Sequence, residues 1–337
     1  MLLSTVFLML LRLNTPNNMK ERVILGIDTS NYTTSVAILS LDGRLIANLK
    51  RLLPVKAGER GLRQSDAVFA HTVNIPELMR EAGKLLCDYE IVAVGVSATP
   101  RNEEGSYMPC FLSGIAAAES ICATAHLPLY RFSHQCGHIM AAVYSSGEQE
   151  LLNRAFGAFH ISGGTTELVR VMPTDAGFET KLLGGTADVN AGQIIDRIGV
   201  YLGMRFPAGP ALEAEALKNT DKIPKKKISI KGMSVNLSGL ENMAIKLYQD
   251  TDNIPLTAAF VFDYIGRAIA AMLDEYTKQY GDSKVVLAGG VMCNSIIKTM
   301  LSASYDVCFA EPSMSADNAV GIAVLTLRSY KSEKNSD

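Results

Sequence analysis

The sequence predicts an α/β protein built from two similar lobes that face each other across a cleft. Two pairs of segments with matching layouts carry this prediction. Residues 23–39 (VILGIDTSNYTTSVAIL) and 155–171 (AFGAFHISGGTTELVRV) each run from an apolar strand through a small polar turn into a second strand. Residues 91–100 (IVAVGVSATP) and 284–294 (KVVLAGGVMCN) each read as a buried strand that ends in small residues. Repetition at this distance indicates duplicated lobes, and a cleft between lobes is a common place for a ligand.

The length of the chain, 337 residues, suits two domains. We expect an extension over 1–18 outside the fold, an N-terminal lobe over 19–150, a C-terminal lobe over 151–330 and a disordered tail over 331–337. The apolar run near the start, within MLLSTVFLMLLRLNTPNN, is too short to span a bilayer and has no basic segment ahead of it. We therefore expect neither a membrane span nor a signal peptide there, and we expect translation to start at Met19.

Composition limits the classes of protein. A hydrophobic share of 48% and a charged share of 20% indicate a globular protein with a large core. The net charge of −2 provides no overall field that attracts nucleic acid, so an RNA contact needs a local basic patch. The best candidate is the run IPKKKISIK at 223–231, although most such runs are solvated loops. The six cysteines include no CxxC pair, which favours reduced thiols in a cytoplasmic protein.

Helical patterns fill the intervals between the predicted strands. In chain order, we expect helices over 65–87, 108–125, 191–203, 254–281 and 316–330. Pro109 is well placed to begin the second of these helices, and Gly203 to end the third. A further helix carries the sequence SHQCGHIMAAV.

The turn inside HISGGTTELVRV has almost no side-chain bulk. Its small residues are Gly163, Gly164, Thr165 and Thr166. Such a turn is compatible with an ordinary hairpin, because glycine adopts turn conformations easily. It also lets a ligand approach the backbone, and N–H groups beside short hydroxyls suit phosphate. The duplicated layout favours the phosphate interpretation, since it places this turn at the cleft.

Two of the five histidines, His134 and His138, are four residues apart. On a helix this spacing puts both imidazoles on one face, which suits two ligands of one metal, although a pair of surface or core histidines would show the same spacing. A hydrolytic zinc helix carries Glu after the first histidine, whereas this chain has Gln135, so a protease of that type is disfavoured. A third ligand must come from elsewhere; Asp317 is a candidate, although Asp317 or Ser315 would equally suit a helix cap.

Acidic and small residues surround the helix predicted over 191–203. Asp188 and Asp196 suit ribose hydroxyls if the helix faces a nucleotide, although each acid alone also fits a solvated helix face. Gly209 lies in a small-residue turn that allows close approach of a base or sugar. The segment LAGGVMCNSII places Asn294 at a strand-to-helix junction, where helix N–H groups favour phosphate or a base edge.

Taken together, the motifs resemble the TsaD family of tRNA threonylcarbamoyl-transferases from about residue 22 to 327. The resemblance rests on GIDTS, AHTVNIPELM, HQCGH, ISGGTTEL, AGQIIDRIGVYLG, FPAGP, LSGL, LAGGVMCN and SADNAVGIA, in the family's order. It implies the superfold of actin, sugar kinases and chaperone ATPases. It also implies that His134, His138 and Asp317 bind iron or zinc. The implied contacts to an adenine nucleotide or acyl-adenylate are Ser162, Gly163, Gly164, Thr165, Thr166, Asp196, Gly209, Glu213 and Asn294.

The chain departs from the family pattern at several positions. Single replacements of the family's usual residues are Cys136, Thr165, Val189, Gln193 and Glu241. The segment SATPRNEEGSYMP at 97–109 replaces a Gly-Pro-Gly loop. The metal triad and the nucleotide frame are kept while the acceptor-facing loops differ, which predicts a divergent paralogue.

The leading hypothesis for function is a metal-dependent transferase that moves a threonylcarbamoyl or related carbamoyl group from an acyl-adenylate to the amine of a tRNA adenosine. It needs no catalytic residue beyond the metal ligands. The alternative is a non-catalytic nucleotide-binding paralogue that acts by lobe closure or partner docking; the substituted loops favour it and the retained triad opposes it. The resemblance implies tRNA, a TsaB-like paralogous subunit and a TsaE-like ATPase as partners. The sequence does not decide whether the protein forms a homo-oligomer, and we expect no membrane partner.

Overall fold

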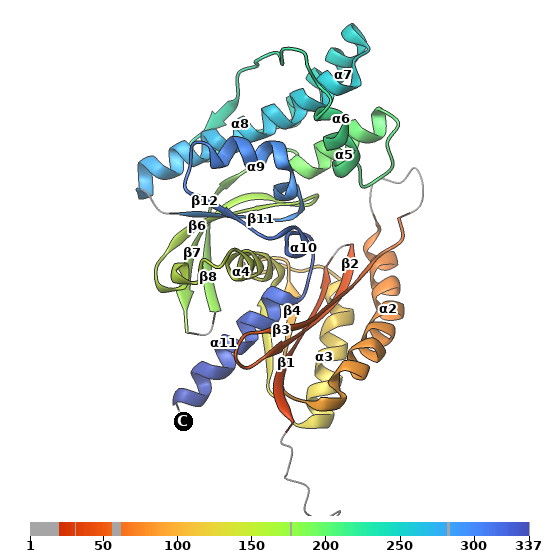
Figure 1. Cartoon of the computed structure of the whole chain (residues 1–337), viewed down its shortest axis with the longest axis vertical. Helices are drawn as coiled ribbons and strands as arrows, with labels where there is room; N and C mark the ends of the chain where they lie inside the picture. The colour runs from red at the N-terminus through yellow and green to blue at the C-terminus, as the bar shows by residue number, and fades with distance from the viewer. Residues whose placement is uncertain (1–19, 31, 56–61, 176, 282–283, 337) are drawn as a thin grey trace, which may run out of the picture.

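Two five-stranded mixed sheets form the frame of the described part of the chain (Figure 1). The computed structural model describes residues 20–30, 32–55, 62–175, 177–281 and 284–336. The predictions about an extension over 1–18 and a start at Met19 therefore lie outside the described residues.

The N-terminal sheet has the strand order β3-β2-β1-β4-β5. Its strands are β1 (Glu21–Ser30), β2 (Thr33–Ser40), β3 (Leu45–Leu52), β4 (Tyr89–Thr99) and β5 (Leu129–Ser133). The first three form an antiparallel meander, while β4 and β5 join β1 in parallel. The helices α2 (Gln64–Leu85) and α3 (Phe111–Ala125) pack on this sheet and bury an apolar core against it. The short helix η1 (Leu86–Asp88) links α2 to β4.

The C-terminal sheet has the order β12-β11-β6-β7-β8 and repeats this plan. Its strands are β6 (Phe156–Ile161), β7 (Thr166–Thr174), β8 (Gly177–Gly185), β11 (Val285–Ala288) and β12 (Val307–Phe309). Beyond it lie α5 (Ala191–Tyr201), α6 (Gly209–Ala216), α7 (Ser238–Thr251), α8 (Ile254–Tyr280) and α9 (Ser295–Ser302). The hairpin of β9 (Ser229–Lys231) and β10 (Ser234–Asn236) and the short helices η2 (Gln149–Asn153), η3 (Gly290–Cys293) and α10 (Pro312–Ser315) complete the elements around this sheet. The predicted α/β architecture of two similar lobes is confirmed.

The helix α8 is long and apolar enough to cross a membrane by length and composition. Most of its residues are nevertheless buried inside the C-terminal core, against α6, α7 and α9. This burial is typical of the central helix of a globular lobe.

Two helices lie between the sheets (Figure 1). The first, α4 (His134–Ser146), packs on β6, β11 and β12, and the second, α11 (Val320–Ser336), packs on β1, β2 and β4. The two helices also contact each other closely, because a Cβ atom at Gly321 would overlap the carbonyl oxygen of Gly137. The last helix, which the sequence places in the C-terminal lobe, therefore covers the N-terminal sheet, while α4 of the N-terminal half covers the other sheet.

The expectation of a disordered tail over 331–337 is wrong for residues 331–336. These residues form the last turns of α11, and Asp337 lies outside the described residues. The polar composition of the tail reflects mostly exposed side chains on a helix that is already anchored by its buried first half. Glu333 adds a local anchor, because its carboxylate accepts a hydrogen bond of 2.6 Å from the Tyr130 hydroxyl.

Candidate metal centre and nucleotide cleft

The first turn of α4 brings two histidines together. The helix begins directly after β5, where the Ser133 hydroxyl caps it by accepting a hydrogen bond from the Cys136 N–H at 3.2 Å. His134 is the first helical residue and His138 lies one turn later, so their Nε2 atoms are only 3.0 Å apart. Both imidazoles therefore lie on one face of the helix, as the four-residue spacing predicts. Cys136 belongs to the apolar core, where its sulfur accepts from the Asn102 amide.

Asp317 reaches the same point from the other end of the chain. Its Oδ1 lies 3.2 Å from His138 Nε2 and 3.6 Å from His134 Nε2. It does not cap the last helix, because Asn318 accepts the hydrogen bond from the Val320 N–H. Two ligand atoms that bind one zinc ion at about 2 Å lie roughly 3.3 Å apart in a tetrahedron, so the spacing of these three atoms fits one metal ion.

A buried carboxylate supports His134 from the N-terminal sheet. Asp28, near the end of β1, is fully buried, and its Oδ2 lies 3.2 Å from His134 Nδ1. The hydroxyls of Ser30 and Ser97 also donate to this carboxylate. Such a contact turns the other ring nitrogen, Nε2, toward a metal. The sequence interpretation missed Asp28, although a charged residue inside an apolar strand was the available signal.

The charges in this centre are strongly coupled. Burial alone would lower the pKa of His134, but Asp28 and Asp317 outweigh it and raise that pKa to about 10. Burial and the nearby His134 lower the pKa of His138. Burial would raise the pKa of Asp317, yet hydrogen bonds and charges from both histidines hold it well below its usual range. In the absence of a metal, the proton on His134 is therefore the positive charge between two carboxylates, a position that a divalent cation would fill.

A third histidine, His160, lies beside this pair and was also missed. It occupies the end of β6, with its ring centroid 4.6 Å from that of His138 and 6.0 Å from that of His134. One ligand atom from each of the three histidines lies within 4.8 Å of the others. Burial, followed by the two neighbouring histidines, lowers the pKa of His160 well below its ordinary value, so its imidazole is neutral.

The glycine turn between β6 and β7 is open at its tip. The Ser162 N–H donates to the Thr165 carbonyl at 2.8 Å, and both Gly163 and Gly164 are exposed. Thr166 is buried, and its hydroxyl accepts from the Ala191 N–H at 2.9 Å, which ties the turn to the start of α5. The backbone of this turn is therefore accessible, whereas the Thr166 hydroxyl already has a structural partner.

Two of the predicted nucleotide contacts, Gly163 and Asp196, line one cavity of about 140 Å³. Its other lining residues are Tyr32, Gln193, Arg197, Val200 and Phe206. Tyr32 comes from the N-terminal lobe and its ring lies 5.9 Å from that of Phe206, so the cavity is shared by both lobes. Burial raises the pKa of Asp196, whose Oδ1 accepts from the Ala208 N–H at 2.7 Å.

The cavity and the histidine centre are close enough to act on the same side chain. After burial, the charges of Asp196 and Asp317 both raise the pKa of Tyr32. The Tyr32 phenol is therefore within electrostatic reach of a predicted nucleotide contact and of a predicted metal ligand. A ligand that spans the two places is compatible with this arrangement.

Gly209, Glu213 and Asn294 lie outside the lining of this cavity, in α6 or at the start of α9. Gly209 begins α6, and Glu213 of the same helix accepts from the N–H and hydroxyl of Ser295 at 2.7 and 2.5 Å. Asn294 caps α9 through its Oδ1, while its buried Nδ2 has no hydrogen-bond partner among the described residues. Asp188 has a structural role, since it accepts from the N–H groups of Leu237 and Ser238 at the start of α7.

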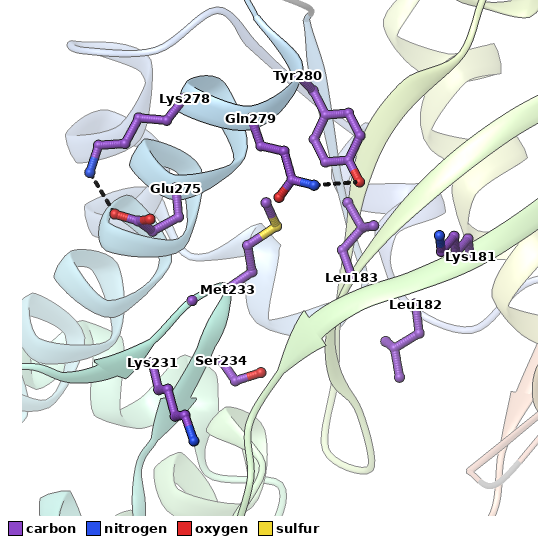
Figure 2. A pocket seen from close by; sticks show the side chains of 11 residues that line it. Lys181, Leu182, Leu183, Lys231, Met233, Ser234, Glu275, Lys278, Gln279 and Tyr280 are labelled. Atoms are coloured by element: carbon purple, nitrogen blue, oxygen red, sulfur yellow. Dashed lines mark hydrogen bonds and ion pairs between the residues drawn. The ribbon is translucent and has the colours of Figure 1, made fainter.

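A larger groove of about 620 Å³ lies elsewhere on the C-terminal lobe (Figure 2). Its walls come from β8, the β9–β10 hairpin and the end of α8, and no predicted metal or nucleotide residue lines it. Of its lysines, Lys278 is paired with Glu275 at 2.5 Å. The basic run 223–231 is likewise partly neutralised, because Lys225 contacts the buried Asp263 at 2.5 Å. The predicted metal and nucleotide residues therefore all lie outside this groove.

The sequence matches a family model over more than half of its length. Residues 59–324 match TsaD, described as tRNA N6-adenosine threonylcarbamoyltransferase. Proteins of that name from Streptococcus suis strain 05ZYH33 and Streptococcus sanguinis strain SK36 are each 30% identical to this chain, over 333 and 338 residues. Each match covers 94% of this chain and 94% of the relative.

Solved structures resemble the chain at low sequence identity. HypF from T. kodakarensis has a TM-score of 0.60 at 15% identity; the match covers 93% of this chain and 48% of HypF. The activator of 2-hydroxyisocaproyl-CoA dehydratase from Clostridium difficile, with bound ADPNP, has a TM-score of 0.55 at 13% identity, covering 94% and 98%. A ROK family glucokinase from Streptomyces griseus has a TM-score of 0.51 at 13% identity, covering 90% and 99%. These similarities confirm the expected superfold and show the fold alone.

Proposed function

We infer the function from a premise that the sequence matches establish: this chain belongs to the TsaD family of tRNA N6-adenosine threonylcarbamoyltransferases. It is therefore a transferase that modifies tRNA. In finer detail, the proposed reaction moves a threonylcarbamoyl group, or a related carbamoyl group, from an acyl-adenylate to the amine of a tRNA adenosine. The observation that carries this proposal is the convergence of His134, His138 and Asp317, in a chain whose two lobes share a cavity lined by Asp196.

The donor set fits a divalent metal. Two imidazole nitrogens and one carboxylate oxygen suit zinc or ferrous iron. The position fits as well, because His134 has a carboxylate behind its Nδ1 and His138 is buried. When bound, the metal would supply Lewis-acid stabilisation of negative charge on the carbamoyl group.

The remaining work belongs to the chain's own side chains. Asp28 orients the His134 ring and so keeps its Nε2 directed away from the β1 strand. Gly163 and Asp196 offer open backbone and a carboxylate to an adenine nucleotide, which would hold the adenylate as the leaving group. Holding both parts of an acyl-adenylate lowers the entropic cost of the transfer without a protein nucleophile.

The alternative function is a nucleotide-binding paralogue without catalysis, and one contact favours it. Arg101, in the segment that replaces the family's Gly-Pro-Gly loop, contacts the buried Glu167 at 2.5 Å. Gln135 donates to the same carboxylate at 2.7 Å. Arg101 thus fixes this segment to the carboxylate that Gln135 of the histidine helix also binds.

The partners and the location follow from the family alone and stay part of the proposal. They are tRNA as acceptor, a TsaB-like paralogous subunit, a TsaE-like ATPase and a cytoplasmic setting. A homo-oligomer is the remaining option for assembly.

Reconstitution tests the reaction. The metal-loaded chain, mixed with threonylcarbamoyl-adenylate, tRNA and the two partner proteins from its host, should produce threonylcarbamoyl-adenosine, detected by mass spectrometry of digested tRNA. His134→Ala in the same mixture is the matched control and should produce none. A folded, metal-loaded chain that binds adenine nucleotide but yields no modified nucleoside would favour the non-catalytic alternative.

A further inference from the structure

The fold directs one histidine toward the predicted metal centre from the opposite lobe. Side chains of β6 alternate between two cores: Phe156 and Ala158 join the core that includes α4, whereas Phe159 and Ile161 join the core that includes α5 and α8. His160 continues the α4 side by this alternation. It therefore lies beneath the first turn of α4, next to His138.

His160 is buried without a hydrogen bond. Its exposed fraction is 3%, and neither ring nitrogen has a partner among the described residues. Leaving buried polar atoms unpaired lowers stability, so native structures pair nearly all of them or place an ion or water there. The nearest strand neighbour, Glu167, pairs across from His160 in β7, but Arg101 and Gln135 already occupy its carboxylate.

The position of His160 suits a shared ion. The His138 and His160 rings are inclined by 33° with their centroids 4.6 Å apart, and one ligand atom from each of the three histidines lies within 4.8 Å of the others. Ligands of one zinc ion are separated by roughly 3.3 Å, so a shared ion would draw the most distant of these histidine atoms closer together. Resting on the metal centre of the proposed function, we propose that His160 is a further ligand of the ion held by His134, His138 and Asp317.

This ligand changes which ion suits the centre. Three imidazoles and one carboxylate would fill a four-coordinate tetrahedral zinc site and leave no open position for substrate, as four protein ligands do in structural zinc sites. Six-coordinate ferrous iron with the same four ligands keeps two positions for substrate atoms. The proposed reaction therefore favours ferrous iron, or another ion of higher coordination number, in this chain.

Replacement of His160 by valine tests the assignment. Apoprotein is titrated with Co²⁺ and with Zn²⁺ in competition with a chelator, and the Co²⁺ absorption spectrum is recorded. For His160→Val we expect an affinity loss above about 100-fold, since losing an outer-shell partner alone costs about 10–100-fold. His126→Asn, which changes an exposed histidine in a left-handed conformation that asparagine tolerates, should match the wild type. Unchanged affinity and an unchanged spectrum in His160→Val would overturn the proposal.

A measurement on the unmodified protein covers the case in which the variant fails to fold. X-ray absorption of the Co²⁺-loaded and iron-loaded wild type counts imidazole ligands. Three imidazoles support the assignment of His160, and two overturn it while leaving the metal centre of the proposed function intact. A wild type that binds neither ion would overturn the metal centre itself, and the ligand role of His160 with it.

Discussion

The two hairpins, β1–β2 and β6–β7, are equivalent in the two lobes, yet the polar side chains near the ends of β1 and β6 have different hydrogen-bond partners. Asp28 pairs across with Ser35, and His160 holds the same place in its hairpin opposite Glu167. The Asp28 carboxylate accepts two hydroxyl hydrogen bonds and contacts His134. His160 has no hydrogen-bond partner among the residues described. The N-terminal hairpin thus supports the predicted metal ligand His134 from behind, and the C-terminal hairpin presents a ring without a hydrogen bond to any described residue.

The turns of the same hairpins differ as well. In the N-terminal lobe the strand pairing continues to Ser30 opposite Thr33, whereas in the C-terminal lobe it ends at Ile161 opposite Thr166. The longer turn leaves the two exposed glycines available to a ligand. The two lobes therefore share the same strand pairing but have turns of different length and composition. We expect nucleotide binding at the glycine turn of the C-terminal lobe.

The largest effect should come from removing a residue of the convergent triad. His138→Ala should abolish most metal binding and transferase activity, because it removes the Nε2 that lies 3.0 Å from His134 Nε2 and 3.2 Å from Asp317 Oδ1. Metal content by elemental analysis and the circular dichroism spectrum check this, and the fold should persist. Cys136→Ser is the control and should retain the metal, since Cys136 lies in the apolar core. Full metal content in His138→Ala would contradict the triad.

The supporting carboxylate should matter less than a ligand. Asp28→Asn should weaken metal binding by about 10–100-fold, the usual cost of losing an outer-shell partner. Chelator competition measures this, with the exposed acid of Asp88→Asn as the control. If Asp28→Asn lowers the metal affinity more than His160→Val does, then Asp28 is not merely a support of His134, and the ligand role proposed for His160 is wrong.

Nucleotide binding should separate from metal binding. Asp196→Ala should weaken adenine nucleotide binding by roughly 10-fold, the effect of one hydrogen bond to a charged group, while metal content is unchanged. Isothermal calorimetry with ATP and elemental analysis on the same sample give both values. Loss of metal in this variant would mean that the cavity and the histidine centre are one site.

The smallest effect concerns a buried histidine outside the centre. His71 is buried, its Nδ1 is 2.8 Å from the Thr34 hydroxyl, and burial lowers its pKa from 6.5 to about 4. Between these values the unfolded chain binds more protons, so stability falls as pH drops from 6.5 toward 4. In metal-free protein, His71→Gln should reduce this loss by about 1–3 kcal/mol. Urea unfolding at pH 7 and pH 4.5 measures it, and equal pH dependence in both proteins would contradict the buried neutral state.

Local signals explain what the sequence predicted well. The four-residue spacing of His134 and His138 needs only one helix, and the strand patterns of both lobes are readable within short windows. Asp28 and His160 were missed because their role depends on contacts between elements far apart in the chain. The helical end of α11 was missed for a similar reason: its polar residues carry no apolar stripe, and Tyr130 lies about 200 residues away.

The packing of α11 on β1 has a consequence for synthesis on the ribosome. β1 emerges before the other described strands, but the helix that covers its inner face is made after every other described element. Until then the N-terminal sheet exposes an apolar face, which is a target for chaperones and a risk for aggregation in the nascent chain. Asp317 lies just before α11, so the proposed metal triad also becomes complete only after the strands of both sheets have been made. A chain stopped before Asp317 would lack both the helix that covers β1 and the third predicted metal ligand.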